Sequence, residues 1–214
     1  DPNAPMKDSD IEWLGLIPKS WDAWKIAHAF GQIGSGTTPP SDQPEWYDGD
    51  IPWVNTSELR ENVIQDTEKK ISKSALEKFS ALKIFPPGTL LMAMYGATIG
   101  RLGILGVEAT TNQACCALVK PVTLNNKFAF YWLWGYREPI IALSSGGGQP
   151  NVNQEKIRVL RVPALSLREQ KAIVVFLDRE TAKIDALIGK IYQHIEKLRE
   201  YRTALISAAV TGKI

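Results

Sequence analysis

The chain has 214 residues, of which 44% are hydrophobic and 22% are charged, and its formal net charge is +2. These proportions are typical of a folded globular protein and exclude a disordered chain. The longest apolar run, residues 128–134, is far shorter than the roughly 20 residues of a membrane-spanning helix, so we expect a soluble, cytoplasmic protein that does not enter a membrane.

Cys115 and Cys116 are the only cysteines. They are too few for a structural zinc site, and we expect both to be buried in a strand.

The charges are distributed unevenly along the chain. Residues 1–165 carry 16 basic and 17 acidic side chains. Residues 166–214 carry 9 basic and 6 acidic side chains and are therefore the more positive part. A uniformly basic nucleic-acid-binding domain is therefore excluded, and any contact with DNA must come from local patches.

Short apolar runs separated by turn residues predict strands before residue 165. Helical spacing of apolar residues predicts two helices in the same region, at 74–83 and at 125–144, and we expect Pro139 to break the second. The strands cluster, and the helices do not alternate with them regularly. This pattern favours an α+β fold with a mixed or antiparallel sheet. The predicted strands are 51–54, 88–95, 99–105, 113–119 and 157–162.

A long helix is predicted after Ser166. Ser166 and Glu169 have the spacing of a capping box, the stretch to Thr211 contains no proline, and Gly212 suits a helix C-terminus. We therefore expect two parts: a globular domain of residues 1–165 and a helical region of residues 166–214.

Apolar residues repeat along this helix in alternating steps of three and four, which is typical of a coiled coil. Nine of the eleven positions in this seam are apolar, and Arg202 is one of the exceptions. A stripe of this length predicts self-association or pairing with a second helix. The alternative is a helix that folds over the core of its own chain. The seam residues that we expect to contact a partner are Leu177, Ile184, Ile188, Ile191, Ile195, Leu198 and Leu205.

Catalytic signatures are weak in this sequence. His28 and His194 lack a second ligand at metal-binding spacing, and no phosphate-binding loop or dinucleotide fingerprint is present. The triplet Glu68-Lys69-Lys70 resembles part of a metal-dependent nuclease site, but it lacks an upstream acidic partner. We therefore predict a chain without catalytic residues, metal ligands or a cofactor of its own.

Loops rich in amide and hydroxyl side chains interrupt the apolar scaffold. An amide offers a hydrogen-bond donor and an acceptor together, as bidentate reading of an adenine edge requires, and nearby basic residues could neutralise phosphates. The alternative is a set of surface loops without a ligand. The predicted DNA-binding residues are Ser35, Thr37, Thr38, Asn55, Thr56, Ser57, Tyr95, Thr98, Arg101, Asn112, Gln113, Gly147, Gln149, Asn151, Asn153 and Lys156, with Arg158 and Arg161 as further candidates for phosphate contacts.

Six groups of motifs, which follow one another over nearly the whole chain, resemble those of Type I restriction-modification specificity subunits. They lie at residues 11–21, 34–39, 51–54, 87–114, 162–178 and 209–214.

The resemblance implies a target recognition domain that reads one half of a split double-stranded DNA sequence, together with a long spacer helix. It also implies methyltransferase subunits that methylate adenine at N6, restriction subunits, and S-adenosylmethionine, ATP and magnesium on those partners, in a bacterial or archaeal cytoplasm.

A complete family member has two recognition domains and two helical regions, whereas this chain has one of each. One interpretation is a half-length subunit that dimerises into an antiparallel pair and reads a palindromic bipartite target. The other is the amino-terminal half of a full subunit. Two further alternatives are a coiled-coil adaptor that does not read DNA and a stand-alone nuclease.

Overall fold

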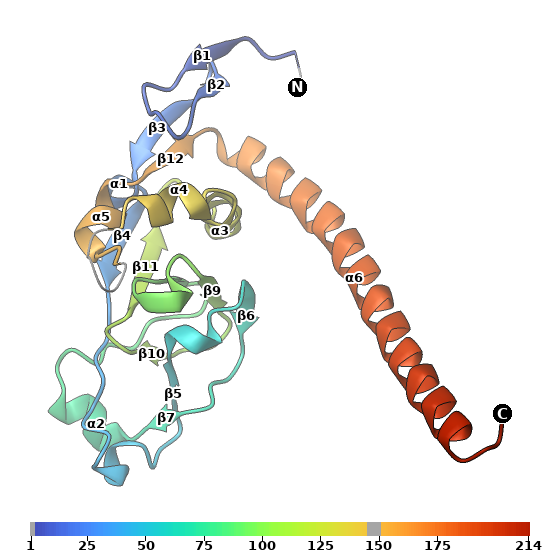
Figure 1. Cartoon of the computed structure of the whole chain (residues 1–214). Coiled ribbons are helices and arrows are strands. Elements are labelled where there is room, and N and C mark those ends of the chain that lie inside the picture. Colours follow the sequence, from blue (N-terminus) through green and yellow to red (C-terminus); the bar gives the residue numbers. More distant parts are fainter. Residues whose placement is uncertain (1–2, 145–150) are drawn as a thin grey trace. The chain divides into compact units, whose positions relative to one another are not determined.

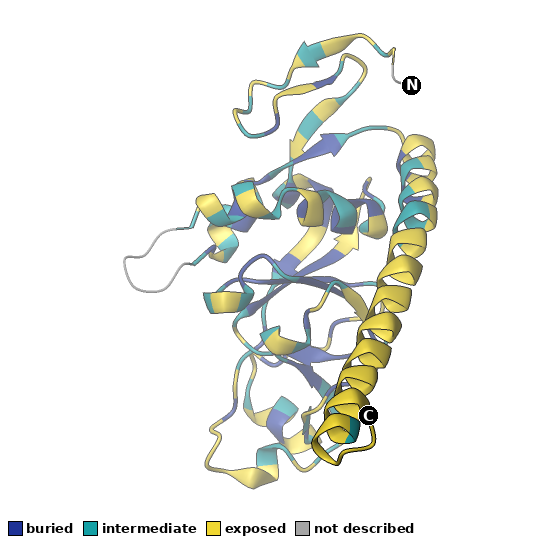
Figure 2. Ribbon diagram, turned by 45° about the vertical axis from the view of Figure 1, so that its right-hand side comes forward, coloured by how far each residue is buried: buried dark blue, intermediate teal, exposed yellow. Residues whose placement is uncertain are grey.

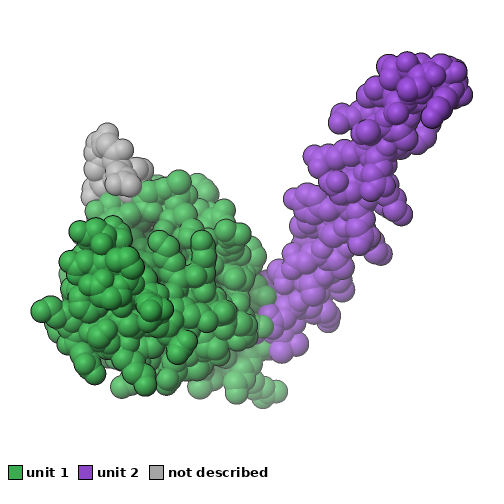
Figure 3. Space-filling model, turned by 90° about the horizontal axis from the view of Figure 1, so that it is seen from below, with its two compact units in different colours: residues 1–171 green, residues 172–214 purple. Residues whose placement is uncertain are grey.

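The computed structural model describes residues 3–144 and 151–214 (Figure 1). The chain divides into two compact units, Asp1–Lys171 and Ala172–Ile214 (Figure 3). The division lies six residues after the boundary expected at 165, because the long helix α6 (Leu167–Val210) begins inside the first unit.

The centre of the first unit is a mixed sheet of five strands in the order β4-β11-β8-β9-β6. Neighbouring strands are antiparallel, except that β6 runs parallel to β9. Gly34 of β4 lies opposite Ala117, and Ala93 of β8 lies opposite Cys115, so β11 begins where β4 and β8 end. The strands are β4 (Phe30–Gly34), β6 (Asn62–Ile64), β8 (Leu90–Ala93), β9 (Leu102–Leu105) and β11 (Cys115–Pro121).

The middle of this sheet forms the hydrophobic core. Every residue of β8 and the first five residues of β11 are buried, which explains why these segments read as continuous apolar runs rather than alternating ones. Burial raises the pKa of the Cys116 thiol to about 12 and raises that of Cys115 as well. Both cysteines are therefore core residues, as the sequence predicted.

A smaller sheet has three strands, which neighbour one another in the order β10-β5-β7. Trp53 and Ile71 from this sheet pack with Ala75 of α2 in a second apolar cluster. The Ser72 hydroxyl caps α2 by accepting the Ala75 N–H at 3.3 Å. The elements are β5 (Ile51–Val54), β7 (Lys70–Ile71), β10 (Thr110–Thr111), α2 (Lys73–Lys78), and the short 3-10 helices η1 (Pro44–Trp46) and η2 (Thr56–Glu58).

Two predictions about the remaining elements, one strand and one helix, are wrong in detail. The strand expected at 157–162 is instead helix α5 (Gln154–Val159) followed by strand β12 (Arg161–Ala164), because Asn153 caps a helix by accepting the Lys156 N–H. The helix expected at 125–144 breaks at Tyr136, between α3 (Asn126–Gly135) and α4 (Arg137–Ala142). Pro139 lies in the first turn of α4, where a backbone N–H has no helical acceptor and a proline is tolerated.

Short elements complete the first unit. Strands β1 and β2 pair with each other, and β3 pairs with β12. They are β1 (Met6–Asp8), β2 (Leu16–Pro18) and β3 (Asp22–Lys25), with the helices α1 (Ile26–Ala29) and η3 (Gly96–Thr98).

Helix α6 starts and ends where the sequence predicted. The Ser166 hydroxyl accepts the Glu169 N–H at 3.2 Å while Glu169 accepts the Ser166 N–H at 3.2 Å, which forms the capping box. At the other end Gly212 adopts a φ of +67°, and the Lys213 N–H reaches back to the Ala208 carbonyl. Exposed residues cover most of the helix after its first turns (Figure 2). The predicted α+β fold with a long C-terminal helix is confirmed.

Candidate functional site

The polar loops singled out in the sequence converge at one edge of the main sheet. The loops that follow β4 and β8 and the loop that precedes β11 meet there because β11 is antiparallel to both neighbours. The Val54 carbonyl accepts the Asn112 N–H at 3.0 Å, which brings the loop after β5 to the same place. We call this region the loop edge and define it as residues 35–38, 55–57, 95–98, 112–113 and 151–154.

The loop after β4 is held by contacts with residues about 75 positions later. The Gly36 N–H donates to the buried Thr111 hydroxyl at 2.9 Å, and the Thr38 hydroxyl donates to Gln113 Oε1. The Thr37 carbonyl accepts the Trp53 indole N–H at 3.0 Å. Thr38 and Gln113 remain exposed, so this part of the loop edge presents polar groups on a fixed backbone.

Asn55 and Asn112 form an amide pair within the loop edge. Asn112 Nδ2 donates to Asn55 Oδ1 at 3.4 Å, while Asn112 Oδ1 accepts the Ala114 N–H at 3.1 Å. The Glu58 carboxylate accepts the N–H of Asn55 at 2.8 Å and that of Glu68 at 2.9 Å. Both asparagines are half-buried, so one face of the pair is accessible.

Residues 151–154 also reach the loop edge. Tyr95 and Asn151 form a β-bridge, and the Val152 N–H donates to the Met94 carbonyl at 3.0 Å. Gln154 Nε2 donates to the Ser35 hydroxyl at 2.9 Å. Thr98 lies next to Tyr95 and donates its hydroxyl to the Tyr95 carbonyl. The structure thus brings Asn151 and Asn153 near the other candidates, whereas Gly147 and Gln149 lie outside the described residues.

The candidate phosphate-binding cations all have partners within the protein. Arg101 forms an ion pair with Glu61 at 3.6 Å, and Lys156 donates to the Leu143 carbonyl at 2.6 Å. Arg158 donates to the Ile33 carbonyl and Arg161 to the Ala23 carbonyl. A phosphate would have to share or replace these partners, and the assignment of these cations to phosphate stays a prediction.

Sequence reasoning missed three residues that contact the candidate DNA-binding residues. Glu58 follows Asn55 at the spacing of a capping box, so the pattern itself was visible in the sequence. Glu61 and Gln154 contact residues that are distant in sequence, Arg101 and Ser35, and no local signal identifies such contacts.

No group of three or more histidine, cysteine or acidic side chains is placed to hold a metal ion within the parts of the chain that the structure describes. In the triplet noted above, Lys69 lies over the Tyr47 ring and Lys70 pairs with Asp66. The same described ranges contain no helix with the length and apolar character needed to cross a membrane.

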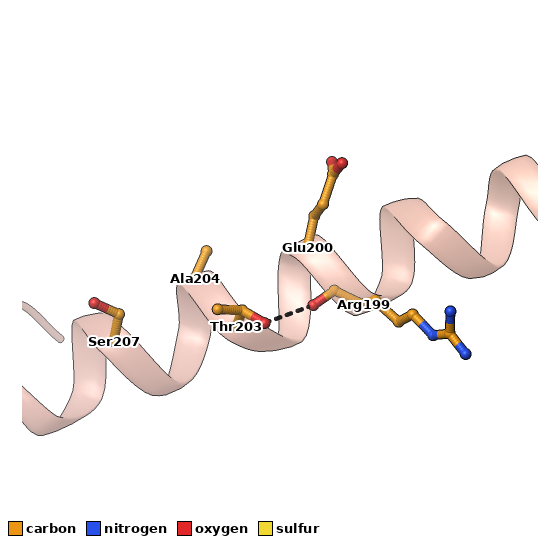
Figure 4. A pocket seen from close by; sticks show the side chains of 5 residues that line it. All are labelled: Arg199, Glu200, Thr203, Ala204 and Ser207. Atoms are coloured by element: carbon orange, nitrogen blue, oxygen red, sulfur yellow. Dashed lines mark hydrogen bonds between the residues drawn. The ribbon is translucent and has the colours of Figure 1, made fainter.

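The predicted seam of α6 is exposed to a degree unusual for large apolar side chains. Exposed fractions include 56% for Ile184, 48% for Ile191 and 66% for Leu198. A shallow pocket near the C-terminal end of the helix is lined by Arg199, Glu200, Thr203, Ala204 and Ser207, and in it the Thr203 hydroxyl donates to the Arg199 carbonyl (Figure 4). The five lining residues belong to one helix surface, and we assign no ligand to this pocket.

The chain is similar to known proteins in sequence and in fold. The MjaIX specificity subunit of Methanocaldococcus jannaschii, a Type I restriction enzyme subunit, is 30% identical over 177 residues, which are 80% of this chain and 40% of that protein. The EcoR124I/EcoR124II specificity subunit of Escherichia coli is 23% identical over 84% of this chain and 45% of its own length. The crystal structure of the HsdS subunit from Thermoanaerobacter tengcongensis shares the fold, with a TM-score of 0.64 at 16% identity over 85% of this chain and 41% of that one.

This chain therefore spans less than half the length of each of these three proteins. A family model described as "Type I restriction modification DNA specificity domain" matches residues 18–197, which is most of the chain. The resemblance noted in the motifs is confirmed, and the chain belongs to the Type I restriction modification DNA specificity domain family.

Proposed function

We propose that residues 1–171 read one half of a bipartite double-stranded DNA sequence through the loop edge, as part of a bacterial or archaeal Type I restriction-modification complex in the cytoplasm. The observation that carries this proposal is the convergence of five polar loops, distant in sequence, on one edge of a buried sheet. A rigid scaffold that presents polar side chains on loops is the arrangement expected of a base-reading surface.

In this proposal the chain supplies recognition and the partner subunits supply chemistry. Methyltransferase subunits would carry S-adenosylmethionine and methylate adenine at N6, and restriction subunits would use ATP and magnesium. The first 165 residues are nearly neutral in charge. The isolated chain would therefore bind DNA weakly and in a salt-sensitive manner until partner subunits add positive surface.

Co-expression of the chain with its modification subunit, followed by sequencing of methylated adenines, tests the proposal. We expect one bipartite motif, and we expect alanine at both Asn112 and Gln113 to change or relax one half of it. A complex whose methylation is unchanged in this variant would favour the adaptor alternative. Cleavage of plasmid DNA by the purified chain with magnesium alone would favour the nuclease alternative.

We further propose that the exposed seam of α6 pairs with α6 of a second copy in an antiparallel orientation. The heptad positions favour this orientation over a parallel one. In a parallel pair in register, Arg202 would face the second copy's Arg202, and Glu180 would lie beside the second copy's Asp185, so like charges would meet.

The antiparallel pair places opposite charges together. When Ile195 packs on the second copy's Ile191, Asp185 faces the second copy's Arg199, and this contact occurs twice by symmetry. In the isolated chain Arg199 pairs with Glu196 at 2.6 Å on the helix surface, an exposed contact that contributes little stability and is easily exchanged. Because each recognition unit continues into the N-terminal end of its helix, the two units of a pair would sit at opposite ends.

Charge exchange tests this pairing. We expect Asp185→Arg and Arg199→Asp each to weaken self-association, measured by analytical ultracentrifugation, and the double variant to restore it. A short bismaleimide should link Tyr192→Cys chains to each other, because this position faces itself in the antiparallel pair. Cross-linking of Leu205→Cys but not of Tyr192→Cys would establish a parallel pair and contradict the proposal.

A further inference from the structure

The orientation of the Asn55–Asn112 amide pair is determined by backbone groups. Asn112 Oδ1 accepts the Ala114 N–H at 3.1 Å, which fixes the oxygen of that amide inward. Its Nδ2 group therefore faces Asn55, and Asn55 must present its oxygen to it, as the 3.4 Å contact shows. The capping box with Glu58 engages the same Asn55 side chain.

This arrangement leaves the pair with donors on its accessible side. Each amide has two N–H hydrogens and one oxygen, and both oxygens already accept hydrogen bonds from the protein. Two hydrogens on Asn55 Nδ2 and one on Asn112 Nδ2 have no acceptor among the residues that the structure describes. Both residues are only half-buried, so part of the pair is accessible to a ligand.

A surface of donors selects one kind of base edge. In the major groove guanine presents two adjacent acceptors, N7 and O6, whereas adenine presents an acceptor beside a donor, thymine a single acceptor and cytosine a donor. An amide that reads adenine presents its oxygen and its N–H group side by side to the base, whereas in this pair each oxygen is directed to a donor of the protein itself, Asn55 Oδ1 to Asn112 Nδ2 and Asn112 Oδ1 to the Ala114 N–H. Phosphate oxygens share the acceptor chemistry of guanine but carry no sequence information.

Resting on the proposed DNA-reading function, we infer that Asn55 and Asn112 together recognise a guanine through its major-groove acceptors. The pair is a specificity determinant for one position of the half-site. Glu58 is the positioning residue, because its carboxylate holds the backbone N–H groups of Asn55 and Glu68 at 2.8 and 2.9 Å.

The first experiment leaves the protein unchanged. Binding of the complex of this chain and its modification subunit is measured on duplexes that contain the sequence motif the complex methylates. Each guanine of the half-site is replaced in turn by 7-deazaguanine, which lacks the N7 acceptor. We expect one guanine at which this replacement weakens binding about tenfold, within the range of a base-specific contact. Tolerance of 7-deazaguanine at every guanine of the half-site would overturn the inference.

The second experiment reverses the hydrogen-bonding character of the pair. Asn55→Asp keeps an oxygen for Asn112 and for the capping box but replaces the outward N–H groups with an acceptor. We expect the preferred base at that position to change from guanine to cytosine, whose N4 amino group is a donor. Asn62→Asp is the matched control, because it adds the same charge at the start of the nearby strand β6 while its oxygen continues to accept the Arg60 N–H. The control should keep the wild-type motif.

The outcomes separate this inference from the proposed function. If the wild-type complex showed no sequence-selective methylation, this result would contradict the proposed function itself. Selective wild-type methylation with an unchanged motif in Asn55→Asp would overturn only the inference. An equal loss of affinity for all sequences in this variant would identify a phosphate contact and would also overturn it.

Discussion

Gly36 and Thr111 are in direct contact although 75 residues separate them in the chain. The Gly36 N–H donates to the Thr111 hydroxyl at 2.9 Å, and a Cβ atom at Gly36 would lie 1.8 Å from the Thr111 carbonyl oxygen. This approach closes the loop after β4 onto β10, and only glycine fits it.

Replacement of this glycine should destabilise the protein. We expect Gly36→Ala to lower the free energy of unfolding by about 1–3 kcal/mol, because the new methyl group must displace buried backbone. Gly34→Ala is the matched control, since no atom lies within 4 Å of a Cβ at that position. Thermal unfolding of the two variants checks the prediction, and equal melting temperatures would contradict it.

Gln170 ties the first turn of α6 to the loop before α3. Its side chain is 1% exposed, accepts the Asn125 N–H at 2.7 Å, and donates to the carbonyls of Thr123 and Leu165. We expect Gln170→Leu to cost about 2–4 kcal/mol, because three partly buried backbone groups lose their partner. Urea unfolding measures the loss. Gln193→Leu, at an exposed position of the same helix, should change stability little.

The capping box at the start of α6 should make stability sensitive to acid. Hydrogen bonds from the Ser166 hydroxyl, and then from its backbone N–H, hold the pKa of Glu169 below its ordinary value. A carboxylate whose pKa is lower in the folded state contributes stability above its unfolded pKa, and this contribution disappears as the pH falls through the folded value.

The difference in melting temperature between wild type and Glu169→Gln should therefore be largest near neutral pH and should shrink on acidification below the ordinary carboxyl range. Glu200→Gln serves as an exposed control on the same helix. A difference that stays constant from pH 7 to pH 3 would show that the charge of Glu169 is not involved.

Both thiols should be unreactive in the folded protein. Burial raises the pKa of Cys116 to about 12 and that of Cys115 in the same direction, and only the thiolate reacts with disulfide reagents. We expect no labelling by Ellman's reagent at pH 8 under native conditions and labelling of both cysteines after denaturation. Rapid native labelling would mean that the main sheet opens readily.

The sequence alone determined the features that depend on local pattern. The capping box of Ser166 and Glu169 and the positive φ of Gly212 bound a helix whose apolar repeat was readable without a structure, because caps and periodicity are local properties. The buried strands β8 and β11 were readable for the same reason. Local pattern failed at residues 157–159, where the Asn153 cap outweighed an apolar run that resembled a strand.

Only the tertiary structure decided what the polar loops do together. Their residue types suggested a binding role, but the contacts of Ser35 with Gln154 and of Glu61 with Arg101 depend on which strands neighbour each other in the sheet. The donor character of the Asn55–Asn112 pair could not be read from two amide residues that are 57 positions apart. It follows from the Ala114 N–H, which binds the oxygen of Asn112 and directs the nitrogen of that amide to the oxygen of Asn55, so that the remaining N–H hydrogens of the pair have no acceptor in the part of the chain that the structure describes.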